Sequence, residues 1–521
     1  MRNPSRWILA VAALFAAARP AHSQVSVTTY HNDNGRTGQN LAETVLTPAN
    51  VNPAQFGRLF RYSVDGYVYA QPLYLQGVAV PDKGTHDVVY VATEHDTVYA
   101  FDAASKKNGP LWKRKFGIRG ARAVKSSEVG CDDLVPEIGI TSTPVIDPVA
   151  SRLYVVAKTM EHGQAKQRLH ALDVATGAEL LGGPVEIVAS VPGTGDGSDG
   201  TMVAFDPLRE HQRAALTLSG GVVSIAWASH CDNGPYHGWV MSYDAQTLAQ
   251  QSVANVTPDG GLGGIWQSGG GLAADAAGNL FAVTGNGTFD ADQGGRNYGD
   301  SIVELSSGPL AISDYFTPFN QAALEAADLD LGSGGAVLLP DQPGAHPHLL
   351  VAAGKEGTIY VVDRDAMGHF NPTDDSQIVQ SLPGVIGGSF DTPAYWNGFL
   401  YYGGTGDNLT AFQLSGGLLS SGAVARSDDG FGFPGPTPVI SANGSTDGIV
   451  WAIRRDDPSA VLFAFDATPD LIGGHLTKLY DSTQAGKRDD AGKAVKFVPP
   501  LVAAGRVYVP AQKRVSIYGL L

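Results

Sequence analysis

Apolar and polar positions recur in a fixed order along the chain. The clearest copy lies between Asp87 and Gly117, where an apolar β-branched run is followed by a polar turn, a second apolar run, another turn and a short segment around Trp112. A preceding apolar run at 68–77 supplies a further strand. Runs this short and this rich in Val, Tyr and Phe, bounded by polar turns, predict β-strands. One copy therefore predicts three or four antiparallel strands.

The same order of runs returns along the rest of the chain. Further copies occupy 141–177, 222–247, 272–308, 336–365, 392–417, 437–467 and 499–521. A unit of three or four short strands cannot bury both of its faces alone, but it can do so when such units stack radially. The repeats therefore predict an all-β fold, an eight-bladed β-propeller of four-stranded antiparallel blades. A two-domain sandwich is the alternative, and the regular spacing of the copies disfavours it.

The two ends of the chain complement each other in this scheme. The last copy, 499–521, lacks an outer strand, and the stretch 56–66 near the N-terminus has the pattern of that missing strand. We therefore expect the N- and C-terminal segments to pair and to close the ring. Residues 24–521 would then form a single propeller domain.

The first residues have the pattern of an export signal. Arg2 and Arg6 give a positive start, 7–18 is apolar but too short to span a bilayer, and 21–23 carries small residues. We expect segment 1–23 to be a signal peptide that is removed. An uncleaved membrane anchor is the alternative, and it would need a longer apolar run. No later stretch is apolar enough to cross a membrane, so we expect a periplasmic or secreted protein.

Composition and charge narrow the choice of partners. The chain has 65 Gly and 31 Pro with only 17% charged residues, which favours short strands and tight turns over long helices. Its formal net charge is −16. Nucleic acids and anionic membranes bind basic patches, so this charge argues against both as partners.

The two cysteines are placed where they could pair. Cys131 precedes the inner strand of one blade, and Cys231 lies in the loop between the second and third strands of the next blade. Both loops emerge on the same face, so we expect a Cys131–Cys231 disulfide in an oxidising compartment. It would close a loop of about 100 residues, worth about 4–5 kcal/mol in the chain-entropy model. There is no CxxCH motif, so no c-type haem attachment is expected.

Polar residues gather in the loops of that same face. They are Glu94 to Asp96, Cys131 to Asp133, His230 to His237, Asn286 to Asp300, Lys355 and Glu356, Asp407 and Asn408, and Arg454 and Arg455. Loops on a rigid scaffold often carry function, and convergent polar groups around a pocket suggest a site. The alternative is that these loops are simply the polar part of the propeller.

One repeat carries a family resemblance. The segment 100–112, AFDAASKKNGPLW, resembles the tryptophan-docking repeat AxDxxTGxxxW of the quinoprotein alcohol dehydrogenases, which use pyrroloquinoline quinone. The copy at 171–180, ALDVATGAEL, keeps the turn without the Trp. The resemblance covers nearly the whole chain at the level of repeats and implies the propeller fold. It does not by itself imply catalysis, because non-catalytic propellers use the same repeat.

Two further matches to that family concern the quinone and a metal. Trp266, in Gly-Ile-Trp before a strand, resembles the Trp that forms the floor beneath the quinone, where a flat ring system would stack on the indole. Asn286, in Thr-Gly-Asn, resembles a calcium ligand, a role that suits an amide oxygen. The alternatives are a core or inter-blade Trp and an Asn that holds a turn.

The stretch from Arg296 to Asp300, RNYGD, looks like the family's Arg-Pro-Gly-Asp. The resemblance implies that Asp300 is the catalytic base beside the calcium, with Arg296 near the cofactor. Lys355, in Gly-Lys-Glu-Gly, resembles the cation that contacts the quinone oxygens and stabilises their negative charge. The alternatives are a turn Asp at the start of a strand and an exposed Lys in a turn.

The chain departs from the family pattern at two places. The family often has a vicinal Cys-Cys disulfide followed by an Arg for a quinone carboxylate, whereas here Cys131 stands alone and Glu137 lies near the expected Arg. Such a Glu would repel a tricarboxylate. The calcium-binding Glu of the third blade is also missing, so Asp232 or Asn233 would have to serve. His230 and His237 nearby suggest either a transition metal or ordinary surface histidines.

Three classes of function remain open. The first is an enzyme that oxidises an alcohol or sugar with bound pyrroloquinoline quinone and calcium and passes electrons to a separate acceptor such as a cytochrome c. The second is a binding or assembly propeller that has lost the cofactor, and the third is a carbohydrate-active lyase or hydrolase. The matches at Trp266, Asn286, Asp300 and Lys355 favour the first class, and the region from Cys131 to Glu137 favours the others.

Overall fold

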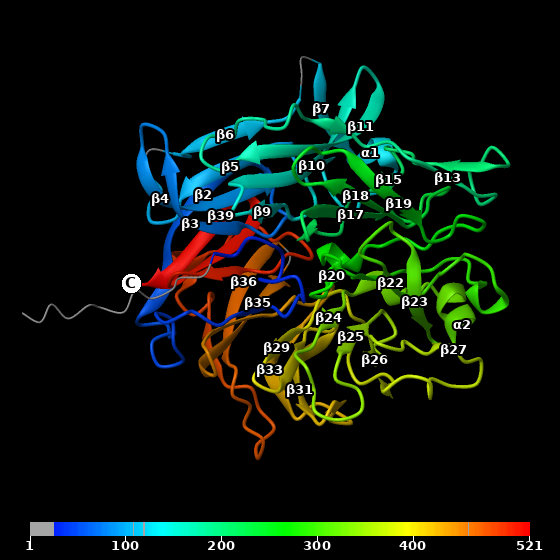
Figure 1. The fold of residues 1–521 in the computed structure, drawn as a ribbon. Helices are drawn as coiled ribbons and strands as arrows, with labels where there is room; N and C mark the ends of the chain where they lie inside the picture. Colours follow the sequence, from blue (N-terminus) through cyan, green and yellow to red (C-terminus); the bar gives the residue numbers. More distant parts are fainter. Residues whose placement is uncertain (1–25, 108, 118–119, 457) are drawn as a thin grey trace, which may run out of the picture.

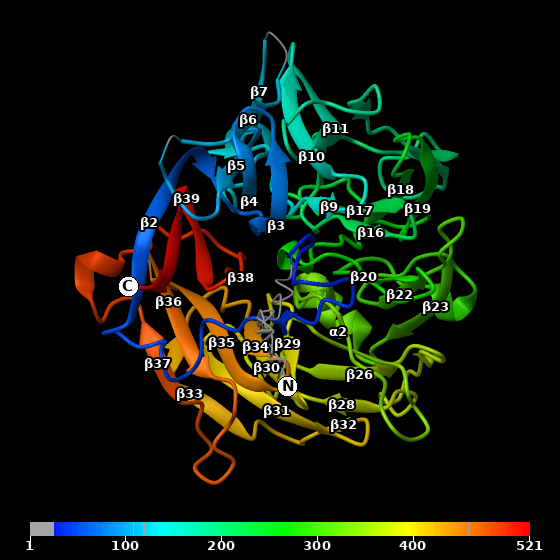
Figure 2. The same ribbon diagram turned by 60° about the vertical axis from the view of Figure 1, so that its left-hand side comes forward.

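Eight large β-sheets stand around a central axis, and the described residues form one further sheet of only two strands (Figures 1 and 2). The computed structural model describes residues 26–107, 109–117, 120–456 and 458–521. The expected signal peptide, 1–23, lies outside these residues. Each of the eight large sheets is one blade, so the predicted all-β, eight-bladed propeller is confirmed. Among the described residues no helix is long and apolar enough to span a membrane.

The strands of each blade run outward from the axis. The innermost strands are β3 (Leu73–Val80), β9 (Val145–Asp147), β16 (Thr217–Ser219), β20 (Ala273–Ala274), β24 (Val337–Leu338), β29 (Ala394–Trp396), β34 (Val439–Asn443) and β38 (Leu501–Ala503). The second strands are β4 (Gly84–Thr93), β10 (Arg152–Glu161), β17 (Val222–Ser229), β21 (Leu280–Val283), β25 (Leu349–Ala353), β30 (Phe399–Tyr402), β35 (Thr446–Asp456) and β39 (Arg506–Leu520). The third strands of blades 1 to 7 are β5 (Thr97–Asp102), β11 (Gln164–Asp173), β18 (Trp239–Asp244), β22 (Ile302–Leu305), β26 (Ile359–Asp363), β31 (Asp407–Ser415) and β36 (Ser459–Asp466). The outer strands are β6 (Trp112–Lys115), β12 (Val185–Glu186), β19 (Gln250–Asn255), β23 (Ile312–Thr317), β28 (Gln380–Leu382), β33 (Ala425–Phe431), β37 (Lys478–Asp481) and, for blade 8, β2 (Phe56–Tyr67).

Short additional strands, helices and turns lie between and beside the blade strands. The additional strands are β1 (Gln39–Asn40), β7 (Ala121–Lys125), β8 (Glu137–Ile138), β13 (Ser190–Pro192), β14 (Met202–Ala204), β15 (Glu210–His211), β27 (His369–Phe370) and β32 (Leu418–Leu419). The α-helices are α1 (Ser126–Val129) and α2 (Gln321–Ala326), and the 3₁₀ turns are Gln267–Gly269, Ala291–Gln293, Leu331–Ser333 and Gly486–Asp489.

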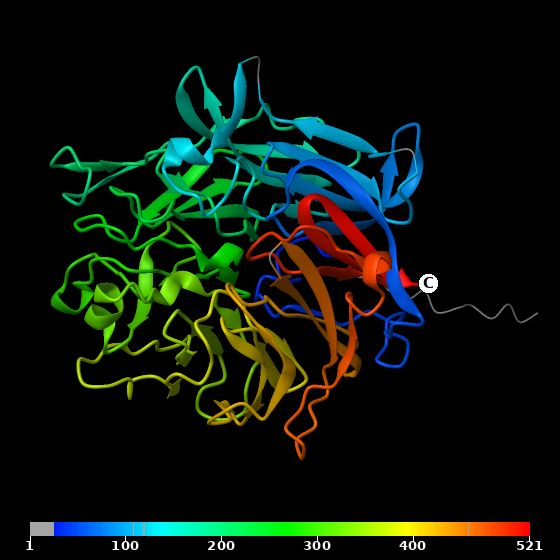
Figure 3. The same cartoon turned by 180° about the vertical axis from the view of Figure 1, so that it is seen from behind.

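The two ends of the chain close the ring. Strand β2 pairs antiparallel with β39, from Phe56 opposite Leu520 to Tyr67 opposite Gln512. The first half of β39 pairs instead with β38, so blade 8 is built from both ends of the sequence. Figures 2 and 3 show β2 lying beside β39. The predicted closure is confirmed.

The hydrophobic core is divided between the blades. Strands such as β25 and β26 are buried along their whole length, as expected for sheets covered on both faces. The buried side chains of all eight blades form eight clusters, and each cluster is shared by two consecutive blades. One of these clusters joins blade 8 to blade 1. Every blade is therefore stabilised by both of its neighbours.

The tryptophan of the repeat docks between blades as the resemblance implied. The Trp112 Nε1–H donates to the carbonyl of Val174 in the next blade at 2.9 Å. Its ring lies against Gly177, where a Cβ atom would come within 2.5 Å of the indole. Trp396, in the innermost strand β29 of blade 6, makes a similar contact with Gly448 of β35 in blade 7, and its Nε1–H donates to the carbonyl of Gly444. Glycine is therefore required at both contacts.

The predicted Cys131–Cys231 disulfide is present, with a Cα–Cα distance of 5.7 Å. Cys131 lies before β9 of blade 2, and Cys231 follows β17 of blade 3. The bond therefore links two adjacent blades at one face of the ring, as the loop topology indicated.

An N-terminal stretch that we call the axial segment (residues 27–40) crosses the centre of the ring (Figure 2, dark blue). It makes hydrogen bonds of 2.7 to 3.0 Å to the innermost strand of every blade. Its partners are Tyr74, Ile146, Leu218, Ala274, Leu338, Tyr395, Ile440 and Val502. An innermost strand has one edge without a neighbour in its own blade, and the axial segment satisfies polar groups along that edge. The sequence pattern did not indicate this role.

Arg36 anchors the axial segment. It is fully buried, and burial lowers its pKa to about 10. Its guanidinium donates to the carbonyls of Leu272 and Tyr30 and to the hydroxyl of Thr217. The side chain therefore ties the segment to blades 3 and 4 through hydrogen bonds from a charged donor, the strong kind.

We expect Arg36→Met to destabilise the protein by about 3–5 kcal/mol, because buried acceptors lose their hydrogen-bond donor while most of the side-chain volume is kept. Guanidinium chloride unfolding measures the change. Arg61→Met, at an exposed position of β2, is the matched control and should stay within about 0.5 kcal/mol of the parent. Equal stability of the two variants would contradict the anchoring role.

Candidate functional site

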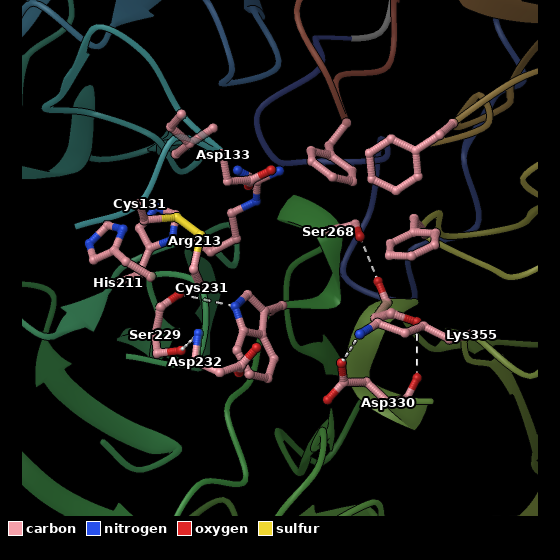
Figure 4. Close-up of a pocket in the computed structure, with 17 residues that line it drawn as sticks. Cys131, Asp133, His211, Arg213, Ser229, Cys231, Asp232, Ser268, Asp330 and Lys355 are labelled. Carbon is pink, nitrogen blue, oxygen red and sulfur yellow. Dashed lines mark hydrogen bonds and ion pairs between the residues drawn. A yellow bond between two sulfur atoms is a disulfide. The ribbon is translucent and has the colours of Figure 1, made fainter. Parts of the chain in front are cut away.

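A cavity of about 240 Å³ lies on the axis of the ring (Figure 4). Seven consecutive blades, 2 to 8, contribute residues to its walls, which places it at the centre of one face. The walls come from the segments before the innermost strands and from the ends of β17 and β25. Of the seven polar loops that the sequence analysis assigned to one face, three contribute residues to these walls: those at Cys131 to Asp133, at His230 to His237, and at Lys355 and Glu356.

The repeat explains which residues reach this cavity. In six blades, a residue that lies four to six positions before the innermost strand lines it. These residues are Arg213, Ser268, Ser333, Phe390, Phe433 and Phe497, from blades 3 to 8 in that order. Sequence reasoning missed all six, although comparison of equivalent positions in the aligned repeats could have identified them. One of them, Ser268, lies two residues beyond the Trp266 that the resemblance did indicate.

Trp266 lines the cavity. Its Nε1–H donates to the carbonyl of Ser229 at 3.1 Å, which fixes the indole (Figure 4). Gly264 and Gly285 leave the room that the indole occupies, since a Cβ atom at either position would lie 2.7 Å from it. The ring of Tyr236 meets it edge-on, at 5.8 Å. The half-buried indole is therefore held in one orientation beside the cavity.

The disulfide also lines the cavity, whereas Glu137 does not. Glu137 lies in β8, where it accepts a hydrogen bond from His95 Nδ1 at 2.8 Å. The cation on this side of the cavity comes instead from Arg213 of blade 3, which Figure 4 shows beside Cys131 and Cys231. The repulsive Glu that the sequence suggested is thus turned away from the cavity.

One wall of the cavity is basic. Arg213 is 4% exposed, its Nη1 has no hydrogen-bond partner, and its guanidinium lies 4.4 Å from the ring of Phe497. His211 stacks on His230 at 4.2 Å, and His211 Nε2 also lacks a partner. Burial lowers the pKa of both histidines well below the usual value, so they are neutral at pH 7. One buried donor, Arg213 Nη1, therefore lacks an acceptor on this wall. The neutral His211 uses its ring N–H toward the carbonyl of Ser229, so its free Nε2 is an acceptor.

Behind this wall lies a buried lysine. The Lys158 ammonium donates to His230 Nε2 at 2.8 Å and to the carbonyls of Leu208 and Glu210. Burial lowers the pKa of Lys158 to about 7. The bond from Lys158 leaves Nδ1 of His230 to carry that ring's proton.

The opposite wall is an ion-paired carboxylate cluster. Lys355 Nζ lies 2.5 Å from Asp330 and 2.7 Å from Asp328. The backbone N–H of Asn286 donates to Asp330 at 2.7 Å, and its side-chain amide donates to Asp328 at 3.0 Å. Burial raises the pKa of Asp330, and the Lys355 ammonium opposes this. Lys355 and Asp330 line the cavity, and Asn286 lies directly behind them.

Asp300 lies behind this wall rather than on it. It is fully buried, and its Oδ1 accepts the backbone N–H of Leu331, the neighbour of Asp330, at 3.0 Å. Its Oδ2 has no partner, and burial raises the pKa of Asp300 to about 8. Its backbone has a φ of 46°. Asp300 is therefore held neutral at pH 7 in contact with the loop that presents Asp330.

The structure does not bring Asn233 and Arg296 to the cavity. The Asn233 amide donates to the carbonyls of Val129 and Gly130 at the outer side of the disulfide. Arg296 is exposed and forms an ion pair with Asp259 at 2.6 Å. Asp232, the other residue considered in the third blade, does line the cavity.

The carboxylates and histidines do not form a metal cage. Within the described part of the chain, no group of three His, Cys, Asp or Glu side chains is arranged to hold a metal ion. His237 is buried, and its two ring nitrogens already contact Thr257 and Asp196. A transition-metal site at the histidines therefore has no support from the geometry.

Comparison with solved structures shows the fold. Quinohemoprotein alcohol dehydrogenase ADHIIG from Pseudomonas putida HK5 matches 95% of this chain and 80% of its own, at 14% identity and a TM-score of 0.61. A europium-containing methanol dehydrogenase matches 95% of this chain and 98% of its own, also at 14% identity and a TM-score of 0.61. Sqt1 of Saccharomyces cerevisiae matches 89% of this chain and 99% of its own at 10% identity and a TM-score of 0.50. No protein-family model and no curated protein matches the sequence.

The raised pKa of Asp300 predicts how stability depends on pH. A carboxyl group whose pKa rises on folding, here from about 4 to about 8, contributes stability that is complete below pH 4 and is lost as pH rises toward 8. The Asp300→Asn protein has no carboxyl group at this position and therefore does not lose this stability. Its melting temperature should rise relative to that of the parent as the pH increases from 5 to 8.

Thermal unfolding of both proteins across that pH range measures the effect. Asp82→Asn, at an exposed turn, is the control and should follow the parent. An Asp300→Asn protein whose melting temperature keeps the parent's pH dependence would show that this carboxyl is not held neutral.

Proposed function

We propose that this chain is an exported dehydrogenase that oxidises an alcohol with bound pyrroloquinoline quinone. The observation that carries the proposal is the axial cavity in which the Trp266 indole stands with the unpartnered Nη1 donor of Arg213. The propeller fold shared with a quinohemoprotein alcohol dehydrogenase and a methanol dehydrogenase is in keeping with it.

The cavity fits the chemistry of this cofactor, which is flat and carries three carboxylates. The indole of Trp266 offers a flat surface for stacking. Arg213 Nη1 is a buried donor that would pair with a carboxylate, and Lys355 supplies a second cation. The quinone, when bound, supplies the acceptor for the hydride of the alcohol carbon.

The protein's own residues supply the proton chemistry. We assign the base to Asp330, because its carboxylate lines the cavity and burial raises its pKa above the usual value. Lys355 holds that carboxylate in place through the ion pair. Asp300, the residue matched to the family's base, would act from behind by fixing the Leu331 backbone and thereby orienting Asp330.

Calcium is not supported by the residues present. Asn286 Oδ1 and Asp300 Oδ2 are buried oxygens without partners, which a hard cation could use. However, the Lys355 ammonium already forms ion pairs with both Asp328 and Asp330, and no group of three His, Cys, Asp or Glu side chains among the described residues is arranged to hold a metal ion. We therefore derive no step through calcium, and Lys355 takes the role of local cation.

Export and electron transfer complete the proposal. The signal-like segment 1–23 and the Cys131–Cys231 disulfide favour a periplasmic or secreted location. The sequence has no CxxCH motif, so the electrons would pass to a separate acceptor such as a cytochrome c.

Titration of the purified protein with pyrroloquinoline quinone, with calcium or with a chelator, tests the proposal by absorbance and tryptophan fluorescence. We expect saturable binding that is about 10- to 100-fold weaker in Arg213→Met, because one charge-assisted pair is lost. Asp330→Asn should bind quinone normally and lose about 10²- to 10⁴-fold in dye-linked alcohol oxidation.

Arg296→Met is the matched control, because this arginine is exposed and outside the cavity. It should bind quinone and turn over like the parent. Absence of saturable binding at micromolar quinone would contradict the proposal and favour a binding or assembly propeller, or a carbohydrate-active enzyme.

A further inference from the structure

Three phenylalanines form one side of the axial cavity. Phe390, Phe433 and Phe497 come from blades 6, 7 and 8. The ring of Phe433 meets those of Phe390 and Phe497 at 5.2 and 6.0 Å, with interplanar angles of 80° and 89°. Phe390 and Phe497 are 6.2 Å apart. The edge-to-face contacts are the arrangement that aromatic rings prefer, so we treat the three as one unit, the Phe triad.

The Phe triad makes the cavity two-sided. The positions that hold phenylalanine in blades 6 to 8 hold Arg213, Ser268 and Ser333 in blades 3 to 5. The side with Trp266, Asp330 and Lys355 is therefore polar, whereas the Phe triad has no hydrogen-bonding group at all. A ligand that fills this cavity must be polar at one end and apolar at the other.

The Phe triad is maintained at a cost in stability. Phe433 is 45% exposed, so a large apolar side chain stays in contact with water. Phe497 has a φ of 62°, a backbone conformation that a bulky residue rarely adopts. Strain of this kind persists where the surroundings impose it, commonly at ligand sites.

Cations hold the Phe triad at the mouth of the cavity. Lys496 lies 5.8 Å from the ring of Phe433 and 5.6 Å from that of Phe497, and it forms an ion pair with Asp133 of blade 2. Arg213 lies on Phe497 from within the cavity. The rings are therefore fixed from two directions, and their remaining apolar surface faces the cavity.

We infer that the Phe triad is the subsite for the apolar, ring-bearing part of the substrate, which makes an aryl-substituted alcohol the substrate class. This rests on the proposed function. The hydroxyl would lie toward Asp330 and Lys355, and the ring would pack on the Phe triad. A sugar fits poorly, because its hydroxyl groups would lose water against three rings that cannot hydrogen-bond to them.

Binding to the quinone-free protein tests this inference separately from turnover. Isothermal titration with 2-naphthylmethanol and with methyl glucoside should show the aryl alcohol binding at least about 10-fold more tightly. Phe433→Ala should weaken naphthylmethanol binding about 5- to 10-fold, as expected for one aromatic contact. Phe319→Ala is the matched control, since Phe319 is 44% exposed and lies outside the cavity, and it should bind like the parent.

The outcomes separate this inference from the proposed function. Tight aryl binding that Phe433→Ala weakens would support the subsite even if quinone does not bind. Equal binding of the glucoside, or a Phe433→Ala protein that binds like Phe319→Ala, would overturn it. Displacement of naphthylmethanol by pyrroloquinoline quinone would also overturn it, because the Phe triad would then belong to the cofactor's own space.

Discussion

The structure depends on the hydrogen bonds between the axial segment and the eight innermost strands. In an eight-bladed ring these strands are too far apart to pair with one another across the axis, so each leaves polar backbone groups facing it. Residues 27–40 satisfy some of these groups in every blade, and Arg36 reinforces the contact by donating to two acceptors in the blades, the Thr217 hydroxyl and the Leu272 carbonyl. The axial segment thus occupies the centre of the ring, and the cavity lies on the same axis at one face of the ring.

Because the centre is fixed, the repeat can place different side chains at equivalent positions around one cavity. Arg213 gives one wall a buried positive charge, Lys355 and Asp330 give another wall an ion pair, and the Phe triad gives an apolar wall. The disulfide holds the loops of blades 2 and 3 at the rim. The chemistry of the cavity therefore depends on which side chain each blade places at the equivalent position, while the arrangement of the blades stays the same.

The sequence was sufficient for features that are local and periodic. Strand runs such as 88–93, the docking of Trp112, the closure by β2 and the Cys131–Cys231 pair all follow from patterns or loop topology. The sequence was insufficient to predict the role of the axial segment, which contains no repeat. It was also insufficient to predict which of Asp300 and Asp330 lines the cavity. Both are loop aspartates, and only packing decides that one is buried behind the other.

The central claim is that the axial cavity is a cofactor site. A crystal structure of the protein grown with pyrroloquinoline quinone tests it most directly. The account predicts density for a flat ring system at the Trp266 indole, with a carboxylate at Arg213 Nη1. Density for the quinone elsewhere on the ring, with only solvent in the axial cavity, would contradict it.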